Sequence, residues 1–214
     1  MASAQVLTSI AIIVMSFIIG LMFFYLTSPL SHVERKQQIE EVISLLINFV
    51  IFIWIGKIVV RFSIFIEDPL AILAYPSDSS AFYVASLLIV VNIVYKMKRH
   101  QFDAESLMRT FVPVFLVSSF VYEFIEMVWQ GNVYSWLYLG LLMVLLLLFL
   151  VGSNQLSETR MSYLLVLIWT TGQLVLTFIE PFATVFGFIM TQWYLIGLLV
   201  LFSGLLIYNR KWVS

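Results

Sequence analysis

Long runs of apolar residues, separated by short clusters of charged and turn-forming residues, dominate the pattern along this chain. The runs fall at residues 6–26, 42–66, 82–95, 111–129, 134–151, 161–179 and 185–208. A helix needs about 20 apolar residues to cross the hydrocarbon core of a bilayer, and most of the runs are close to that length. The pattern therefore predicts an all-α polytopic membrane protein with seven transmembrane helices, forming a single domain over residues 1–214.

The composition supports a membrane protein and disfavours several other classes. Of the 214 residues, 62% are hydrophobic and 11% are charged, whereas soluble proteins average about 25% charged residues. The net charge of −1 and the lack of a basic segment argue against nucleic-acid binding, which needs clustered Lys and Arg. With no cysteine and only two histidines, we expect no disulfide, no thiolate chemistry, no metal site and no cofactor.

The distribution of basic residues indicates the orientation of the helices. All eleven Lys and Arg residues except Lys57 and Arg61 lie between the first and second, third and fourth, or fifth and sixth runs, or after the last run. The alternate segments, at residues 67–81, 130–134 and 180–184, contain none. Because Lys and Arg are enriched on the cytoplasmic side of a membrane, this pattern predicts an N-out, C-in topology.

Local sequence also predicts helix ends and groups at the bilayer surface. Ser31 with Glu34 forms a capping-box pattern, and Asp103 can cap the fourth helix. Residues 67–80 contain Asp-Pro, then apolar residues and a Pro-Ser turn, which predicts a short interfacial segment. Aromatic side chains near the predicted surfaces are expected among the headgroups. These are Trp129, Tyr134, Trp136 and Tyr138 outside, and Tyr208 and Trp212 inside.

Five ionisable residues lie within or at the end of the predicted spans, where a charge is costly and usually faces the bundle interior or a water-filled cavity. They are Lys57, Arg61, Glu123, Glu126 and Glu180. Lys57 and Arg61 are four residues apart, so they are predicted to share one face of the second helix. Glu123 and Glu126 are three residues apart, so they are also predicted to share a face, on the fourth helix.

Uncharged polar residues continue these faces at helical spacing. Ser119 and Tyr122 extend the acidic face of the fourth helix, and Gln173 and Thr177 lead to Glu180 along the sixth. The sequence therefore predicts a polar cavity, open to the outer side, between the second, fourth and sixth helices.

The basic pair has two interpretations. Arg offers a two-pronged donor and Lys a point charge, so Lys57 and Arg61 can bind a phosphate, and the abundant phosphate of a bilayer is a lipid headgroup. Alternatively, they form ion pairs with Glu123 and Glu126 that specify helix packing, while Glu180 only marks the outer surface. A third interpretation makes the carboxylates proton or cation sites of a transporter, although no inverted repeat with paired broken helices is visible.

Short motifs between residues 39 and 131 occur in an order known from one family of membrane enzymes. Residues 55–58 read Ile-Gly-Lys-Ile, and residues 68–70 read Asp-Pro-Leu. Both resemble elements of the prolipoprotein diacylglyceryl transferase family, whose members have seven spans and the same N-out, C-in topology. In this resemblance, Lys57 occupies the position of a family arginine.

The chain departs from that family at the motifs that carry its chemistry. The family's His-Gly-Gly is replaced by Tyr-Val-Ala at residues 83–85. Its signature Gly-Arg-x-Gly-Asn-Phe-x-Asn-x-Glu falls on residues 119–128, where Phe120 replaces the arginine and Glu123 and Glu126 replace the two asparagines. The resemblance therefore implies a shortened scaffold in a bacterial cytoplasmic membrane, with the family's binding of phosphatidylglycerol, rather than its reaction.

Three functions are expected, in this order. The first is a non-catalytic relative that binds a lipid or a membrane-protein partner, with Lys57 and Arg61 contacting a phosphate. The second is acyl or diacylglyceryl transfer to a lipoprotein-type acceptor, with Tyr83, Glu123 or Glu126 as replacement acid and base. The third is a small transporter or a channel subunit.

Overall fold

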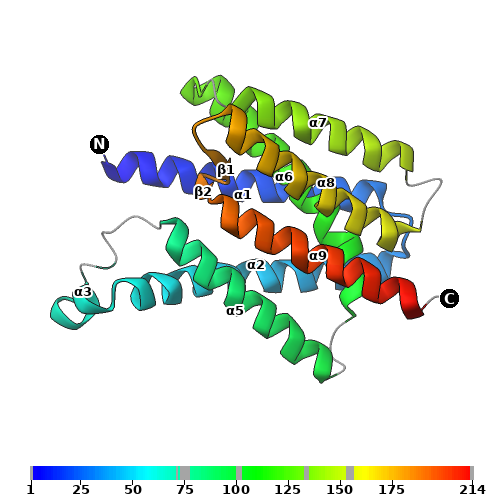
Figure 1. Cartoon of the computed structure of the whole chain (residues 1–214), viewed down its shortest axis with the longest axis horizontal. Coiled ribbons are helices and arrows are strands. Elements are labelled where there is room, and N and C mark those ends of the chain that lie inside the picture. Colours follow the sequence, from blue (N-terminus) through cyan, green and yellow to red (C-terminus); the bar gives the residue numbers. More distant parts are fainter. Residues whose placement is uncertain are drawn as a thin grey trace. The chain divides into compact units, whose positions relative to one another are not determined.

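The structure, a computed structural model, describes residues 2–70, 72, 78–99, 103–132, 135–152 and 157–212. Helices account for most of them, which confirms the predicted all-α class, and one short hairpin is added (Figure 1). The elements are α1 (Ala2–Thr27), α2 (His32–Val60), α3 (Phe62–Glu67), α5 (Ser79–Lys98), α6 (Ala104–Gln130), α7 (Ser135–Gly152), α8 (Glu158–Ile179), β1 (Ala183–Val185), β2 (Phe188–Met190) and α9 (Gln192–Trp212).

Five of the described helices are long and apolar enough to cross a membrane. The candidate spans are Thr8–Thr27, His32–Val60, Ser79–Lys98, Ala104–Trp129 and Glu158–Ile179, and shorter apolar stretches occupy Trp136–Gly152 and Gln192–Ile207. Large apolar side chains such as Leu26 and Val200 are exposed on these helices. Such a surface is unfavourable in water but suits contact with acyl chains. The chain is therefore a multi-pass helical membrane protein.

The described residues form two compact units. Unit 1 combines Met1–Arg35 with Met108–Ser214, and unit 2 is Lys36–Leu107. Unit 1 thus contains α1, most of α6, the helices α7 to α9 and both strands. Unit 2 contains most of α2, all of α3 and α5, and the first residues of α6.

Helix α8 is central to the packing of unit 1, because it contacts both α7 and α9. Fully buried leucines on four helices form much of this core: Leu116, Leu142, Leu145, Leu165 and Leu195. Helices α1 and α6 approach closely at Gly20, where a Cβ atom would overlap the Ser118 hydroxyl. Tight contact of this kind, through a small residue, is typical of helix packing in membranes.

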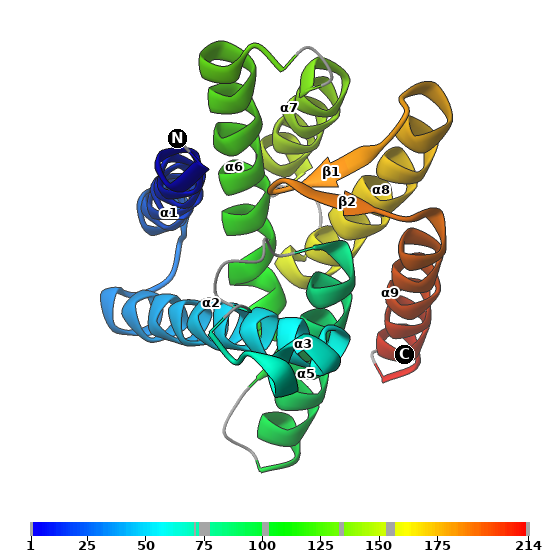
Figure 2. The same cartoon turned by 90° about the vertical axis from the view of Figure 1, so that its left-hand side faces the viewer.

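A β-hairpin at Ala183–Met190 stands where the sequence predicts the first turns of the last span, and that prediction of a helix from residue 185 is wrong. Strand β1 pairs antiparallel with β2, with Val185 opposite Phe188. The two turn residues, Phe186 and Gly187, have φ values of 50° and 81°, as a type I′ turn requires. Figure 2 shows the hairpin reaching from the end of α8 toward α6.

The apolar composition of the hairpin explains why the hydrophobic pattern misassigned it. Residues 185–190 are apolar throughout apart from Gly187, so hydropathy alone cannot distinguish a buried strand from a helix. The distinguishing features are the β-branched residues and a glycine able to adopt a left-handed conformation. Helix α9 begins only at Gln192.

Phe186 anchors the hairpin to the helices of unit 1. Its ring centroid lies 4.9 Å from that of Phe17 on α1, and 5.5 Å and 6.0 Å from those of Tyr122 and Phe115 on α6. A positive φ costs a non-glycine residue about 1–2 kcal/mol, and each aromatic pair stabilises by about 0.5–1.5 kcal/mol beyond burial. The ring contacts therefore offset the strain of the turn.

Unit 2 is organised by the contact between α2 and α5. A Cβ atom on Gly56 would lie 2.5 Å from the carbonyl oxygen of Ala81, so the two backbones are nearly in contact. The rings of Phe49 and Phe82 meet edge to face nearby, with centroids 5.3 Å apart.

The run predicted as one helix over residues 42–66 is interrupted at Arg61. This residue has φ −117° and ψ 42°, so it separates α2 from α3, although its amide still donates to the Lys57 carbonyl oxygen at 3.0 Å. Lys57 and Arg61 are therefore not on one uninterrupted helix as predicted.

Several predicted helix ends are confirmed. The Ser31 amide donates to the Glu34 carboxylate at 3.2 Å and the Glu34 amide donates to the Ser31 hydroxyl at 3.4 Å, which is the predicted capping box. Asp103 accepts from the amides of Glu105 and Ser106 at the start of α6. The predicted interfacial segment at 67–80 lies largely outside the described residues.

The aromatic residues predicted at the outer surface do not all lie there. Trp129 and Trp136 are exposed, as an interfacial position requires. Tyr138 is buried instead, with 4% of its surface accessible, and its hydroxyl accepts a hydrogen bond from Trp169 inside unit 1. Tyr134 and the side chains of Tyr208 and Trp212 lie outside the described part of the chain.

We expect Gly56→Ala to destabilise unit 2, because its methyl group must displace the Ala81 backbone. Overpacking of this kind costs about 1–3 kcal/mol. Thermal unfolding of the purified protein measures the effect. Gly140→Ala is the matched control, since a Cβ there meets nothing within 4 Å. An equal response of the two variants would contradict the close approach of α2 and α5.

Candidate functional site

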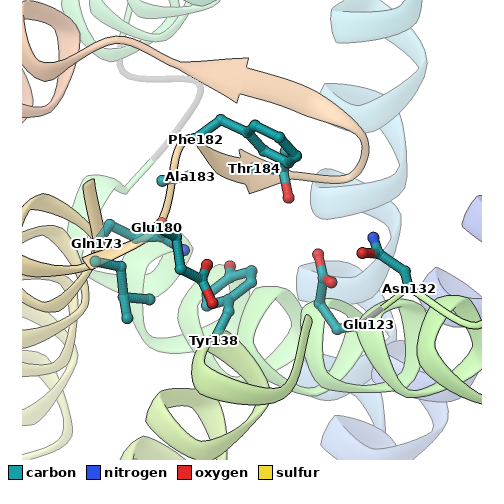
Figure 3. Close-up of a pocket in the computed structure, with 9 residues that line it drawn as sticks. Glu123, Asn132, Tyr138, Gln173, Glu180, Phe182, Ala183 and Thr184 are labelled. Atoms are coloured by element: carbon teal, nitrogen blue, oxygen red, sulfur yellow. The ribbon is translucent and has the colours of Figure 1, made fainter. Parts of the chain in front are cut away.

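A small polar pocket lies within unit 1, below the hairpin (Figure 3). Its cavity volume is about 10 Å³, which is space for roughly one water molecule. Its lining residues are Glu123, Asn132, Tyr138, Gln173, Leu176, Glu180, Phe182, Ala183 and Thr184.

Three helices and one strand position the lining residues. Glu123 comes from α6 and Tyr138 from α7. Gln173 projects from α8, and Glu180 follows the last residue of that helix with extended backbone angles, φ −106° and ψ 153°. Thr184 belongs to β1. Figure 3 shows the carboxylates of Glu123 and Glu180 on opposite sides of one space, with the Thr184 hydroxyl pointing down into it.

Polar side chains of the pocket are deeply buried. Glu123 is 2% exposed and Gln173 is 0% exposed. Neither amide atom of the Gln173 side chain has a hydrogen-bond partner among the described residues. Burying an amide without a hydrogen bond costs at least about 1–3 kcal/mol. The lining of the pocket therefore contains unsatisfied hydrogen-bonding groups.

Tyr138 links α7 to α8 beside this pocket. Its hydroxyl accepts a hydrogen bond from Nε1 of Trp169 at 3.1 Å, and both residues are buried. The side chains of Ser119 and Gln173 approach the same hydroxyl without forming a well-aligned hydrogen bond to it. The hydroxyl of Tyr138 therefore contributes a polar group to the lining of the pocket.

Two other predicted cavity residues lie next to the pocket without lining it. Tyr122 is buried beneath the turn, where a Cβ atom on Gly187 would lie 3.0 Å from its hydroxyl. That hydroxyl donates to the carboxylate of Glu126, one turn further along α6. Thr177 is also outside the lining, because its hydroxyl donates to the Leu174 carbonyl oxygen at 2.7 Å and accepts from Gln192.

The basic residues form a separate cluster in unit 2. Lys57 is 5% exposed, and its ammonium lies 4.7 Å from the centroid of the Trp54 ring. A guanidinium nitrogen of Arg61 lies 3.1 Å from a carboxylate oxygen of Asp78. Asp78 also caps α5, accepting from the Ala81 amide at 2.9 Å. We call Lys57, Arg61 and Asp78 the basic cluster.

The structure therefore divides the predicted site residues between two places. Glu123, Gln173 and Glu180 line the pocket of unit 1, whereas Lys57, Arg61 and Tyr83 belong to unit 2. The predicted pairing of Lys57 and Arg61 with Glu123 and Glu126 stays a prediction. Within unit 2, Arg61 forms an ion pair with Asp78. The Tyr83 ring packs edge to face on Phe82, with centroids 6.3 Å apart.

Sequence reasoning missed several residues of these sites, among them Asp78, Asn132, Tyr138 and Thr184. Asp78 precedes two serines and an apolar run, which is an N-cap pattern that could have identified it. Asn132 and Tyr138 carried no comparable signal, because a polar loop residue and an aromatic near a span end are both ordinary. Within the described residues, no group of three His, Cys, Asp or Glu side chains is placed to hold a metal ion.

Comparisons with protein-family models, with curated proteins and with solved structures found no match. The class of the protein therefore follows from its own fold and sites. It is a multi-pass helical membrane protein, with a water-sized acidic pocket in one unit and, in the other, a basic cluster of which Lys57 is buried.

We expect Tyr138→Phe to lower the free energy of unfolding, because the buried Trp169 N–H loses its acceptor. Leaving one such donor unsatisfied costs about 1–3 kcal/mol. Chemical or thermal unfolding in detergent provides the measurement, with Tyr95→Phe, at an exposed tyrosine, as control. If both variants match the wild type, the Tyr138–Trp169 bond does not contribute to stability.

Burial raises the pKa of the Glu180 carboxyl above its ordinary value of 4.5. As pH rises from about 4.5 through the raised pKa, the carboxyl ionises first in the unfolded chain, so the free energy of unfolding falls. Glu180→Gln removes this titration. We therefore expect the thermal midpoint of the wild type, relative to that of the variant, to decrease as pH rises.

The measurement is a series of thermal midpoints between about pH 4 and 8, the range in which a carboxyl group with a raised pKa titrates. Glu40→Gln, at an exposed carboxylate of α2, corrects for the general effect of removing a charge. A thermal midpoint of the wild type that rises with pH relative to that of Glu180→Gln would contradict the burial of Glu180.

Proposed function

We propose that this protein binds the phosphate headgroup of an anionic membrane lipid through Lys57 and Arg61, without catalysing a reaction. The observation that carries the proposal is the deep burial of the Lys57 side chain near the end of an apolar membrane helix, beside Arg61. A cation in such a place is costly and is generally retained for a function.

The charges of the basic cluster favour an anion. Lys57 and Arg61 contribute two positive charges and Asp78 one negative charge, and both other groups act electrostatically on the Lys57 ammonium. The cluster therefore has a net charge of +1 by this arithmetic. A guanidinium carries five N–H donors, and an ammonium three, so both groups can donate to a phosphate as well as to protein acceptors.

The position of the cluster fits a headgroup. Helix α2 has 29 residues, which corresponds to about 43 Å at about 1.5 Å per residue and exceeds the bilayer core of about 30 Å. Its charged first turns lie toward one surface, so its end at Val60 reaches the other. Lys57 is three residues before that end, and Asp78 immediately precedes α5. This length supports a position of the basic cluster at the level of lipid phosphates.

The finer topology belongs to the same proposal. The five long spans together with the shorter apolar helices α7 and α9 account for seven crossings. The distribution of Lys and Arg along the sequence supports the N-out, C-in orientation. In that orientation the end of α2, and with it the basic cluster, faces the outer leaflet of a bacterial cytoplasmic membrane.

Phosphatidylglycerol is the lipid we expect, on the resemblance of residues 39–131 to prolipoprotein diacylglyceryl transferases. The absence of catalysis rests on the same resemblance, since Tyr83 stands where that family has a histidine, and Glu123 and Glu126 replace its asparagines. A membrane-protein partner that uses the exposed apolar faces is compatible with lipid binding.

The test is lipid retention measured by native mass spectrometry of the purified protein. We expect Lys57→Gln and Arg61→Gln each to weaken phosphatidylglycerol binding about tenfold, because a charged hydrogen bond contributes about 1.5–3 kcal/mol. Lys36→Gln is the control, since this exposed lysine pairs with Glu40 away from the cluster. Equal retention of lipid by all variants would contradict the proposal.

A parallel assay addresses the enzymatic expectation. The purified protein is incubated with phosphatidylglycerol and a lipobox-cysteine peptide, and diacylglyceryl transfer is read by mass spectrometry. We expect no product above background. Product that disappears in Tyr83→Phe, Glu123→Gln or Glu126→Gln would overturn the non-catalytic assignment and show which side chain takes part.

A further inference from the structure

We propose that the pocket of unit 1 is a binding site for one dehydrated monovalent cation of about the size of sodium, held by oxygen atoms of Glu123, Glu180 and Gln173. This site shares no residue with the basic cluster, and the proposal does not depend on lipid binding. Its charge is opposite to that of the basic cluster, so the two sites select opposite kinds of ligand.

The size of the pocket limits its ligand. A cavity of about 10 Å³ holds a single water molecule or a single ion without its hydration shell. An organic amine, a nucleotide or a lipid headgroup is too large. The polar groups around the cavity must therefore replace the hydration shell of whatever ion enters.

The chemistry of the lining selects a cation with a preference for oxygen. Glu123, Glu180, Gln173, Asn132 and Thr184 all bring side-chain oxygens to the lining, and Tyr138 adds a hydroxyl. None of the nine lining residues is Lys, Arg or His. Hard cations prefer such carboxylate, carbonyl and hydroxyl ligands.

Gln173 provides an observation independent of the two carboxylates. Its side chain is fully buried and lines the pocket, and its amide oxygen and nitrogen have no hydrogen-bond partner among the described residues. A bound cation would accept the amide oxygen as a ligand, and this contact would remove the cost of leaving that oxygen unsatisfied.

A monovalent ion fits better than a divalent one. Magnesium keeps several waters, so it needs more space than a cavity of about 10 Å³ offers. Calcium takes six to eight oxygen ligands, whereas the side chains of Glu123, Glu180 and Gln173 together supply at most five. Two carboxylates around one monovalent cation leave a single excess negative charge. The titratable groups that face the site are Glu123 from α6, Tyr138 from α7 and Glu180 after α8. Protonation of one carboxyl would neutralise the excess charge.

The bound ion would connect separate parts of unit 1. Glu123 lies on α6, Gln173 on α8 and Glu180 in the segment that leads into β1. Ligands from these elements would meet at one ion, so binding is expected to stabilise the attachment of the hairpin to the helices. A ligand that binds the folded state raises the thermal midpoint with its concentration.

The test measures binding of radiolabelled sodium to the purified protein, together with its thermal midpoint in sodium, potassium and choline chloride at constant ionic strength. We expect saturable binding of one sodium ion per chain. We also expect sodium to raise the midpoint more than choline does. Absence of saturable binding to the wild type, or equal midpoints in all three salts, would overturn the proposal and leave the pocket as a water site.

Variants locate the ion. Glu123→Gln removes the negative charge of one ligand and Gln173→Met removes a ligand oxygen, both with little change in size, and we expect each to abolish saturable sodium binding. Glu126→Gln is the matched control, since it removes a carboxylate from α6 three residues away that does not line the pocket. Gln173→Met keeps the net charge, so it tests the site even if Glu123→Gln fails to fold. Sodium binding that survives in Gln173→Met and in a folded Glu123→Gln would contradict the assignment.

Discussion

The constraint on which this structure depends is that polar groups buried in a membrane protein have no bulk water to bind. Helices satisfy it for the backbone, because each amide bonds within its own segment. The hairpin satisfies it by pairing β1 with β2, which makes non-helical backbone tolerable inside unit 1. Buried side chains satisfy it by bonding to one another, as when Trp169 donates to Tyr138. Among the described residues Gln173 is one of the exceptions, and it lines the pocket.

The hairpin and the pocket form one arrangement. Phe186 holds the turn against Phe17 on α1 and against α6, in a conformation that phenylalanine adopts only when its surroundings enforce it. The pairing of β1 then fixes Thr184 above the pocket, while the end of α8 places Glu180 beside it. A continuous helix from residue 185 would remove the hairpin that lies above the pocket. The geometry of the site therefore depends on the hairpin that replaces the first turns of the last predicted span.

The sequence predicted the helical membrane class, the capping box at Ser31 and the buried character of Glu123 and Gln173, because hydropathy and helical spacing act locally. It did not predict the hairpin, since apolar residues fit a strand or a helix equally well until their tertiary contacts decide. The burial of Tyr138 depends on Trp169, 31 residues along the chain. Long-range pairs of this kind have no signature in a single sequence.

The most direct test of this account asks whether residues 183–190 form a hairpin or a helix. The chain has no cysteine, so single-cysteine variants at Ala183, Val185 and Ile189 can be compared by their rates of reaction with N-ethylmaleimide. The hairpin predicts slow reaction at Ala183→Cys and Val185→Cys, which are 3% exposed, and fast reaction at Ile189→Cys, which is 50% exposed. On a helix, residues two apart lie on nearly opposite faces. Fast reaction at Val185→Cys beside slow reaction at Ala183→Cys would contradict the hairpin.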